Sequence, residues 1–511
     1  MIPVSALVIM KLKNISSYDC IIGMRTLALF FMIAISAYLR GEVEAFPVRL
    51  SHPLTQTIAQ SNVIVMVRLV AYIADPNDKL PVATKTPKGL VYTGPDAFLI
   101  INRLKPRGQY TFEVLQTLKG QIEKTLQIKL PRVLARYYGG ARLKVEPDDK
   151  FLLLLKRDTQ NHWMPTDDTV PLIPLSTNAS TVNDQVADHE ESTASIQSRV
   201  ISLMLSGLAE PTVRQSNVYL VRDTIDPQVV SGLAPYLDDT NIEIQDYVLY
   251  GLATNQQVLI IPRIAALQTK MGTDEGPMSR SPRSLVALQH FTTREALPYL
   301  DPLLFNTSRL TRINVMLGLI NIADRTSIPY LLLALRDPDP KNFISPTAAQ
   351  LIYRLVPELG RGKTDSTFLA HRDEEVQSVS TWWKDELAGK HPHAADEKER
   401  IVLNVGQTHD AKELPQLNEA LFMRNEATRR AAIEALDKLA DQSSVPYLII
   451  ALRDPQGDVA YGAHQILARL VPELGPSLPR AAFDTSCDQL ADAGVKWWIK
   501  HLTDAEKAHA F

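Results

Sequence analysis

A long block of residues occurs twice in this 511-residue chain, and this duplication restricts the possible folds more than any other feature. The stretch Ser327-Ile-Pro-Tyr-Leu-Leu-Leu-Ala-Leu-Arg-Asp-Pro338 returns as Ser444-Val-Pro-Tyr-Leu-Ile-Ile-Ala-Leu-Arg-Asp-Pro455, at an offset of 117 residues. Further along, Arg354-Leu-Val-Pro-Glu-Leu-Gly360 returns as Arg469-Leu-Val-Pro-Glu-Leu-Gly475, now at an offset of 115. Such a duplication indicates stacked repeats, because each unit has an apolar face that it cannot bury alone.

Each copy has the apolar spacing of paired helices. Ser327 is expected to cap a helix whose first turn contains Pro329, and Asp337-Pro338 is expected to end it. A second helix is predicted from about Ser345-Pro346 in the first copy and from about Asp458 in the second. Antiparallel helix pairs result, and the repeated modules could stack end to end.

This pattern resembles the HEAT-type repeat, in which a proline- and leucine-containing helix is followed by an aspartate turn and a second helix. The resemblance is carried by residues 297–319 and 327–355, and by the equivalent residues 414–436 and 444–470. Weaker repeats follow the same pattern in residues 229–267. The resemblance implies an α-solenoid, of HEAT or armadillo-like type, with a groove for a protein or peptide partner.

Each copy closes with a predicted helix that contains two adjacent tryptophans, over residues 376–387 and 491–502. These tryptophans either seal the end of the module by packing or form a binding hot spot. The Arg-Asp pair of each turn is interpreted as a turn-stabilising ion pair, with ligand binding as the alternative. The candidate structural or partner-contact residues are Trp382, Trp383, Trp497, Trp498, Arg336, Asp337, Arg453 and Asp454.

The region from residue 46 to residue 175 has the two-residue period of strands instead. Strands are predicted at 62–73, 110–115, 125–130 and 151–155, which favours a small barrel or sandwich. The run from Phe112 to Gly120, followed by an alternating strand and Lys150-Phe-Leu-Leu-Leu-Leu155, resembles the netrin-like or TIMP-like barrel, an OB-type fold.

The metal-chelating cysteine of the inhibitors in that family has no counterpart here, because Phe46 stands at the expected mature N-terminus. Inhibition of a metalloprotease is therefore not expected. An OB-type barrel could bind an oligosaccharide or single-stranded nucleic acid, but stacking aromatics interleaved with basic residues are sparse. The aromatic residues expected in the core or at the rim are Tyr92, Phe98, Tyr110, Phe112, Tyr137 and Tyr138.

The N-terminus has the features of a secretory signal. Met24-Arg25 precedes the apolar stretch from Leu27 to Leu39, and Val43-Glu44-Ala45 provides a small-x-small cleavage site. Met24 is the expected start, with an unusually long n-region formed by residues 1–23 as the alternative. Cleavage after Ala45 would leave Phe46 first, with cleavage after Ala37 as the alternative. The protein is therefore expected to be exported, to the periplasm or outside the cell. After cleavage no membrane span is expected.

The predicted fold class is multidomain α+β, with a small N-terminal β-barrel or sandwich followed by an all-α HEAT-like solenoid. The predicted parts are a leader and signal peptide (1–45), the β-rich OB or netrin-like domain (46–175), a flexible linker (176–195), weaker helical repeats (196–283) and two HEAT modules with their Trp-Trp helices (284–390 and 397–505).

No sequence motif of a known catalytic, cofactor or metal site occurs, so no catalytic residue, cofactor or metal is expected. His391 and His393 flank a proline and give only a weak metal hint, and Asp238-Asp239 is explained by turn formation. Cys20 and Cys487 are the two cysteines, and only the second would survive signal cleavage. The net charge of −3 gives no reason to expect nucleic acid as a partner.

The sequence thus predicts an exported, non-enzymatic scaffold that binds a protein or peptide in a solenoid groove. Two alternatives stay open: a cell-envelope or polysaccharide-binding protein acting through the barrel, and a HEAT-like lyase. The oligomeric state is not predicted.

Overall fold

The computed structural model of the chain describes residues 54–74, 83–86, 89–92, 108–130, 147–166, 172–176, 192–271, 282–339, 343–360, 368–391 and 411–509. The predicted signal peptide, its cleavage sites, Cys20, His393 and most of the predicted linker lie outside these residues. Two edges of that linker are described: Ser176 is buried and a helix already begins at Thr193.

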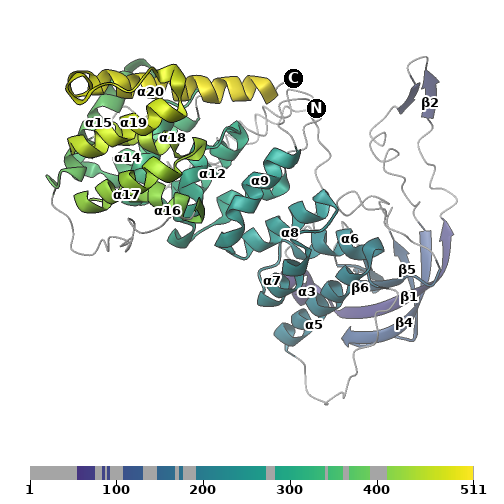
Figure 1. Ribbon diagram of the computed structural model, residues 1–511. Coiled ribbons are helices and arrows are strands. Elements are labelled where there is room, and N and C mark those ends of the chain that lie inside the picture. The colour runs from purple at the N-terminus through teal and green to yellow at the C-terminus, as the bar shows by residue number, and fades with distance from the viewer. Residues whose placement is uncertain are drawn as a thin grey trace, which may run out of the picture. The chain divides into compact units, whose positions relative to one another are not determined.

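The N-terminal part of the described chain is a nearly closed antiparallel β-barrel, drawn in purple and blue in Figure 1. Its elements are α3 (Leu54–Gln60), β1 (Val63–Ala74), β4 (Gly108–Lys119), β5 (Thr125–Leu130), β6 (Lys150–Arg157), β7 (Trp163–Pro165) and β8 (Ile173–Pro174). The strand order is β5-β4-β1-β6-β7, and β8 pairs with β6. The end strands β5 and β7 also contact each other, which nearly closes the sheet. A separate hairpin joins β2 (Ala83–Thr86) to β3 (Gly89–Tyr92).

Residue type explains which strands lie at the centre of this sheet. Residues 63–67 of β1 and 151–155 of β6 are all apolar and all buried, as expected for strands covered on both faces. β5 instead alternates exposed and buried residues and lies at an end of the strand order. Gly120, at φ +75°, closes the β4–β5 turn; a Cβ there would lie 2.4 Å from the Asn62 carbonyl oxygen. All four predicted strands are confirmed as parts of β1, β4, β5 and β6.

The remainder of the described chain is helical, which confirms the predicted fold class. The longer helices are α5 (Thr193–Ser206), α6 (Pro211–Val221), α7 (Pro227–Leu233), α8 (Ile242–Thr254), α9 (Ile261–Met271), α12 (Arg309–Ile322), α13 (Ile328–Ala334), α14 (Ile344–Leu355), α15 (Arg372–Leu387), α16 (Leu414–Ala420), α17 (Glu426–Leu439), α18 (Val445–Ala451), α19 (Gly457–Leu470) and α20 (Arg480–His509). Two short helices, α10 (Arg283–Val286) and α11 (Leu297–Leu300), precede α12, and the 3₁₀ turn η5 (Ala287–His290) continues α10.

The start of α13 differs from the prediction. Ser327 was expected to cap this helix, but its hydroxyl donates to Asp301 at 3.0 Å instead. The capping side chain is Asp324, which accepts the Thr326 N–H at 2.9 Å and opens a 3₁₀ turn that leads into the helix. Asp441 opens the second copy in the same way. Ser327 therefore lies inside the helical segment, one turn after the true cap.

The two copies, which we name module 1 (residues 284–390) and module 2 (residues 397–505), meet through equivalent aromatic residues. Phe305 stacks on Tyr330 within module 1, with ring centroids 5.4 Å apart, and Phe422 stacks on Tyr447 within module 2 at 5.5 Å. Between the modules, Phe305 meets Tyr447 edge to face at 5.2 Å, and Phe422 meets Tyr330 at 5.4 Å. Each contact between the modules thus has a counterpart with the roles exchanged.

The tryptophan helix of each module likewise contacts the phenylalanine of the other module. Trp383 of α15 lies 6.5 Å from Phe422, and Trp498 of α20 lies 6.3 Å from Phe305. A self-complementary contact of this kind is the signature of a two-fold arrangement. The expectation that the modules stack end to end is therefore wrong at this junction. In an end-to-end stack, Trp498 at the end of module 2 would not reach Phe305 at the start of module 1.

Candidate functional site

A buried ion pair occurs at the equivalent position of each of the two modules. Arg429, in the first turn of α17, donates through Nε to Asp454 at 2.6 Å, and Arg312 of α12 makes the same contact with Asp337. Each guanidinium also donates to two backbone carbonyls of the turn before its own helix. Both arginines are 0% exposed. Burial raises the pKa of Asp454, while the bonds to Arg429 lower it. Because both side chains are fully buried, the pair is structural and closed to ligands.

A third pair of the same kind occurs in the weaker repeats and was missed from the sequence. Arg214 of α6 donates to Asp239 at 2.8 Å, and its guanidinium also donates to the Leu208 and Ala209 carbonyls. The sequence had explained Asp238-Asp239 by turn formation alone. The signal that could have found this pair is its spacing of 25 residues, which all three pairs share.

The predicted ion pairs within Arg336-Asp337 and Arg453-Asp454 are wrong. Arg336 donates to Asp373 of α15 at 2.7 Å, and Arg453 donates to Asp492 of α20 at 2.5 Å. Adjacent side chains leave the turn in different directions, so the aspartate binds inside the repeat and the arginine reaches the tryptophan helix. The two arginines therefore tie each tryptophan helix to its own module.

Three of the four candidate tryptophans are buried. Trp382, Trp383 and Trp498 are 6%, 9% and 7% exposed, and the first two pack in one apolar cluster with Ile328, among others. Trp497 is half-buried and stacks on His501 with centroids 5.1 Å apart. This burial favours packing for three of the tryptophans and leaves Trp497 as the one among the four with an accessible edge.

Arg222 is a buried cation that the sequence analysis did not single out. It is 1% exposed, and its guanidinium carbon lies 3.9, 4.9 and 5.0 Å from the ring centroids of Tyr219, Tyr247 and Tyr250. The ring faces stabilise the cation electrostatically. Burial raises the pKa of Tyr247 to about 12, so this ring stays neutral at physiological pH. We interpret this cluster as part of the repeat core.

Two amide side chains join successive loops at one edge of the weaker repeats. Asn255 accepts the Asp226 N–H and donates to the Thr224 carbonyl, both at 2.9 Å. The next residue, Gln256, has a positive φ of 59° and donates to the His290 carbonyl at 2.7 Å. The loops of three successive repeats are therefore hydrogen-bonded to one another along this edge.

Large apolar side chains project from these joined loops. Ile225 is 75% exposed and Leu259 is 73% exposed, the two highest values among the exposed large apolar residues of the described chain. Single exposed apolar residues are common, but Ile225 lies between Thr224 and Asp226, which Asn255 bonds, and Leu259 lies in the 3₁₀ turn η4 (Val258–Ile260) that follows Asn255. We refer to Ile225 and Leu259 as the loop edge.

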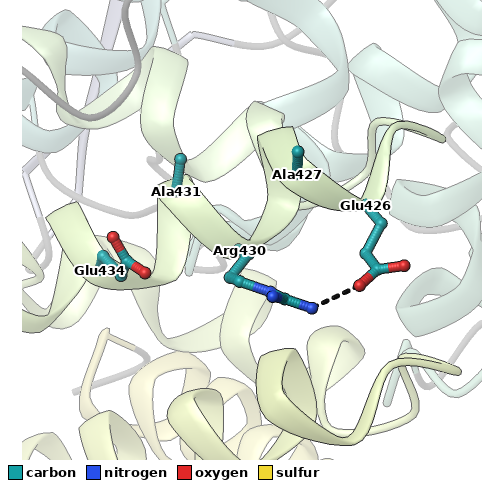
Figure 2. A pocket seen from close by; sticks show the side chains of 5 residues that line it. All are labelled: Glu426, Ala427, Arg430, Ala431 and Glu434. Atoms are coloured by element: carbon teal, nitrogen blue, oxygen red, sulfur yellow. Dashed lines mark hydrogen bonds and ion pairs between the residues drawn. The ribbon is translucent and has the colours of Figure 1, made fainter.

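A groove of about 460 Å³ lies along one face of α17. Figure 2 shows its lining, in which the methyl groups of Ala427 and Ala431 alternate along the helix with Glu426, Arg430 and Glu434. Arg430 donates to Glu426 at 2.5 Å, a pair one helical turn apart. Small-molecule pockets are mostly lined by large apolar and aromatic side chains. This groove is instead an uncovered helix face.

The part of the chain that the structure describes lacks two kinds of site. It holds no group of three or more His, Cys, Asp or Glu side chains placed to bind a metal ion. None of its helices is both long enough and apolar enough to cross a membrane.

Comparison with known proteins relates a segment of module 2 to a repeat family. The sequence model of the PBS lyase HEAT-like repeat matches residues 428–454, the segment that starts beside Arg429 and ends at Asp454. No curated protein matches the chain, and no solved structure matches it. The match and the helical region together fit a HEAT-repeat protein. Because the match covers a single repeat unit, it carries no enzymatic activity to this chain.

Proposed function

We propose that this chain is an exported, non-enzymatic scaffold whose HEAT-like repeats bind a protein or peptide partner. The observation that carries the proposal is the loop edge. Ile225 and Leu259 are about three-quarters exposed on loops that hydrogen bonds hold in place. Exposed apolar side chains on an ordered surface are typical of contact sites for other proteins.

The rigidity of this surface supports binding without a large ordering cost. The loops are fixed by side-chain hydrogen bonds, and helix α6 behind them is fixed by the partly buried Arg214–Asp239 pair. A surface that is already ordered loses little conformational entropy when a partner binds. The export part of the proposal rests on the signal-like sequence before Phe46.

The alternative is binding of an envelope polysaccharide through a netrin-like or OB-like barrel. The described aromatics Tyr110 and Phe112 are both 0% exposed and lie in the barrel core, which leaves neither ring for sugar stacking. Ile73, 67% exposed on β1, provides a surface position on the barrel for a direct comparison with the loop edge.

Cross-linking of the protein to its binding partners in the native host tests the scaffold proposal against the barrel alternative. The full-length protein would be cross-linked in the host, and mass spectrometry would identify its mature N-terminus and its cross-linked proteins. The variants are Ile225→Asp with Leu259→Asp, and Ile73→Asp as the matched barrel variant. The proposal expects Phe46 as first residue and a set of proteins lost only in the loop-edge variant.

Three results would count against it. Loss of neighbours only in Ile73→Asp would favour the barrel alternative. An unprocessed N-terminus in the cytosol would refute export. An unchanged set of neighbours in the loop-edge variant would remove the surface on which the scaffold proposal rests.

A further inference from the structure

In module 1, the cation Arg325 lies against three groups beside the tryptophan helix. Its guanidinium carbon is 5.9 Å from the ring centroid of Trp382. Its Nη2 donates to Glu358 at 2.8 Å, and its Nε donates to the Leu355 carbonyl at 3.3 Å. A guanidinium that lies over an indole ring and pairs with a carboxylate is stabilised by both contacts. Module 1 therefore holds an arginine in a site made of one ring, one carboxylate and one carbonyl.

Module 2 keeps the ring, the carboxylate and the carbonyl of this site but replaces the arginine. At the offsets of the duplication, the counterparts of Trp382, Glu358, Leu355 and Arg325 are Trp497, Glu473, Leu470 and Gln442. Gln442 donates through Nε2 to the Leu470 carbonyl at 2.8 Å, the contact that the arginine makes through Nε in module 1. The glutamine side chain ends at this nitrogen, so it supplies no cation to the ring or to the carboxylate.

The turns that carry these residues have the same backbone in both modules. The 3₁₀ turns η8 (Arg325–Ser327) and η12 (Gln442–Ser444) follow capping aspartates with φ values of −126° and −124°. The 3₁₀ turns η9 (Pro357–Leu359) and η13 (Pro472–Leu474) carry the two glutamates. They follow valines with φ values of −127° and −132° and end at glycines with positive φ. The backbone therefore places the glutamine and the glutamate of module 2 as it places the arginine and the glutamate of module 1.

The tryptophan helices also meet these turns in the same way. α15 contacts η9, and α20 contacts η13. The ring planes of Trp382 and Trp383 are 37° apart, and those of Trp497 and Trp498 are 34° apart. The first tryptophan of each pair therefore has the same orientation within its module.

The site of module 2 is more accessible than that of module 1. Trp382 is 6% exposed, whereas Trp497 is half-buried and Glu473 is exposed. His501 stacks on Trp497, but one ring covers only one face of an indole. Among the residues that the structure describes, no cation pairs with Glu473 as Arg325 pairs with its counterpart.

We propose that Trp497 and Glu473 bind an arginine side chain of a protein or peptide partner, as Trp382 and Glu358 bind Arg325. The ring face attracts the cation, and the carboxylate accepts from the guanidinium nitrogens. Arginine fits better than lysine, because a planar guanidinium can lie on a ring and pair with a carboxylate at once, whereas an ammonium is compact and strongly hydrated. This site is separate from the loop edge, and the inference depends neither on that surface nor on export.

Fluorine NMR of the full-length protein tests the site. The five tryptophans would be labelled as 5-fluorotryptophan, and the signal of Trp497 would be assigned by its loss in Trp497→Phe. The probe is N-acetyl-arginine amide, added at constant ionic strength and below the concentration that unfolds the protein. It is expected to move the Trp497 signal, and N-acetyl-lysine amide is expected to move it less at every concentration. Trp163 is the internal control, because Arg157 already lies over its ring at 3.6 Å.

Variants at two positions identify the groups that bind the probe. Gln442→Arg restores the residue of module 1 and is expected to abolish the response, because the chain then fills its own site. Gln442→Met, which adds no charge, is the matched control and should keep it. Glu473→Gln is expected to bind about two- to fivefold more weakly, the range of an exposed ion pair.

Three results would contradict the proposal. An unmoved Trp497 signal in the wild type would show that the site is absent or already filled by the chain itself. An unchanged response in Gln442→Arg would show that the probe binds elsewhere. Equal shifts with the lysine amide would overturn the assignment to arginine.

The same variants test the geometry without any ligand. If Glu473 is placed like Glu358, the new arginine of Gln442→Arg pairs with it, and Glu473→Gln removes that gain in stability. Urea unfolding of both single variants and of the double variant is expected to give a coupling of about two- to fivefold in the unfolding equilibrium constant. Purely additive effects would show that the glutamate does not face residue 442, and the proposed site would fail.

Discussion

The buried pair between Arg429 and Asp454 gives the sharpest prediction, because the same substitution can be made one residue away as a control. Arg429→Met removes a guanidinium that is 0% exposed and leaves the Asp454 carboxylate without its cation. It also leaves two backbone carbonyls without their donor. Arg430→Met instead removes an exposed cation, about half accessible, that pairs with Glu426.

The expected magnitudes follow from burial. Removing one partner of a buried ion pair costs about 3–5 kcal/mol, because the remaining charge is left uncompensated in the core. An exposed pair one helical turn apart contributes only about 0.3–0.5 kcal/mol. If the two modules unfold together as one unit of about 150–250 residues, each kcal/mol shifts Tm by about 2–4 °C. The loss in Arg429→Met then corresponds to a fall in Tm of roughly 6–20 °C. Arg429→Met with Asp454→Leu should recover most of that loss, because neither charge is then buried.

Urea unfolding followed by tryptophan fluorescence measures these differences. Four of the five tryptophans lie in the two modules, so a Trp163→Phe background restricts the signal to them. A loss in Arg429→Met no greater than that in Arg430→Met would refute the reasoning. So would a double variant whose loss equals the sum of the two single variants.

Three further outcomes are expected. Phe422→Leu should lower the stability of the modules by about 0.5–1.5 kcal/mol beyond its lost apolar area, because its stack on Tyr447 and its edge contacts disappear; thermal unfolding checks this. His464 accepts the Leu478 N–H at 2.9 Å, and burial lowers the pKa of its imidazole, so the unfolded chain binds the proton more tightly. Stability should therefore be complete above about pH 6.5 and fall as the pH drops below it, and His464→Gln should flatten this dependence in urea titrations at pH 5 and 7. Asp246 accepts the N–H groups of Arg283 and Ser284 at 2.8 Å, so Asp246→Ala should cost about 1–3 kcal/mol, with Asp246→Asn losing less in the same assay.

Local patterns in the sequence were enough to predict much of the fold. The two-residue period located β4 and β5, continuous β-branched and apolar runs located β1 and β6, and the helical spacing with Asp-Pro ends located α13 and α18. The tryptophan helices were also found, although α15 and α20 both begin earlier than predicted. These features depend on residues close in the chain, whose periodicity is set by the backbone itself.

The candidate surfaces were less accessible to prediction. Exposure of Ile225 and Leu259 depends on which loops Asn255 joins, and Arg336 finds its partner on a helix that begins more than thirty residues later. The Arg214–Asp239 pair was readable in principle, since its spacing repeats in both modules. It was missed because Asp238-Asp239 was attributed to turn formation.

By itself the sequence determined that the modules are duplicates, that each has an apolar face, and that Arg429 and Asp454 recur with their module 1 counterparts. Only the tertiary structure decided that the two faces meet by exchange of equivalent residues, Phe305 with Tyr447 and Phe422 with Tyr330, and not end to end. The physical reason is that burial of an apolar face is non-directional. A duplicated face fits its own copy as well as it fits a neighbour in a stack, and the specific ring geometry of the aromatic residues selects between them.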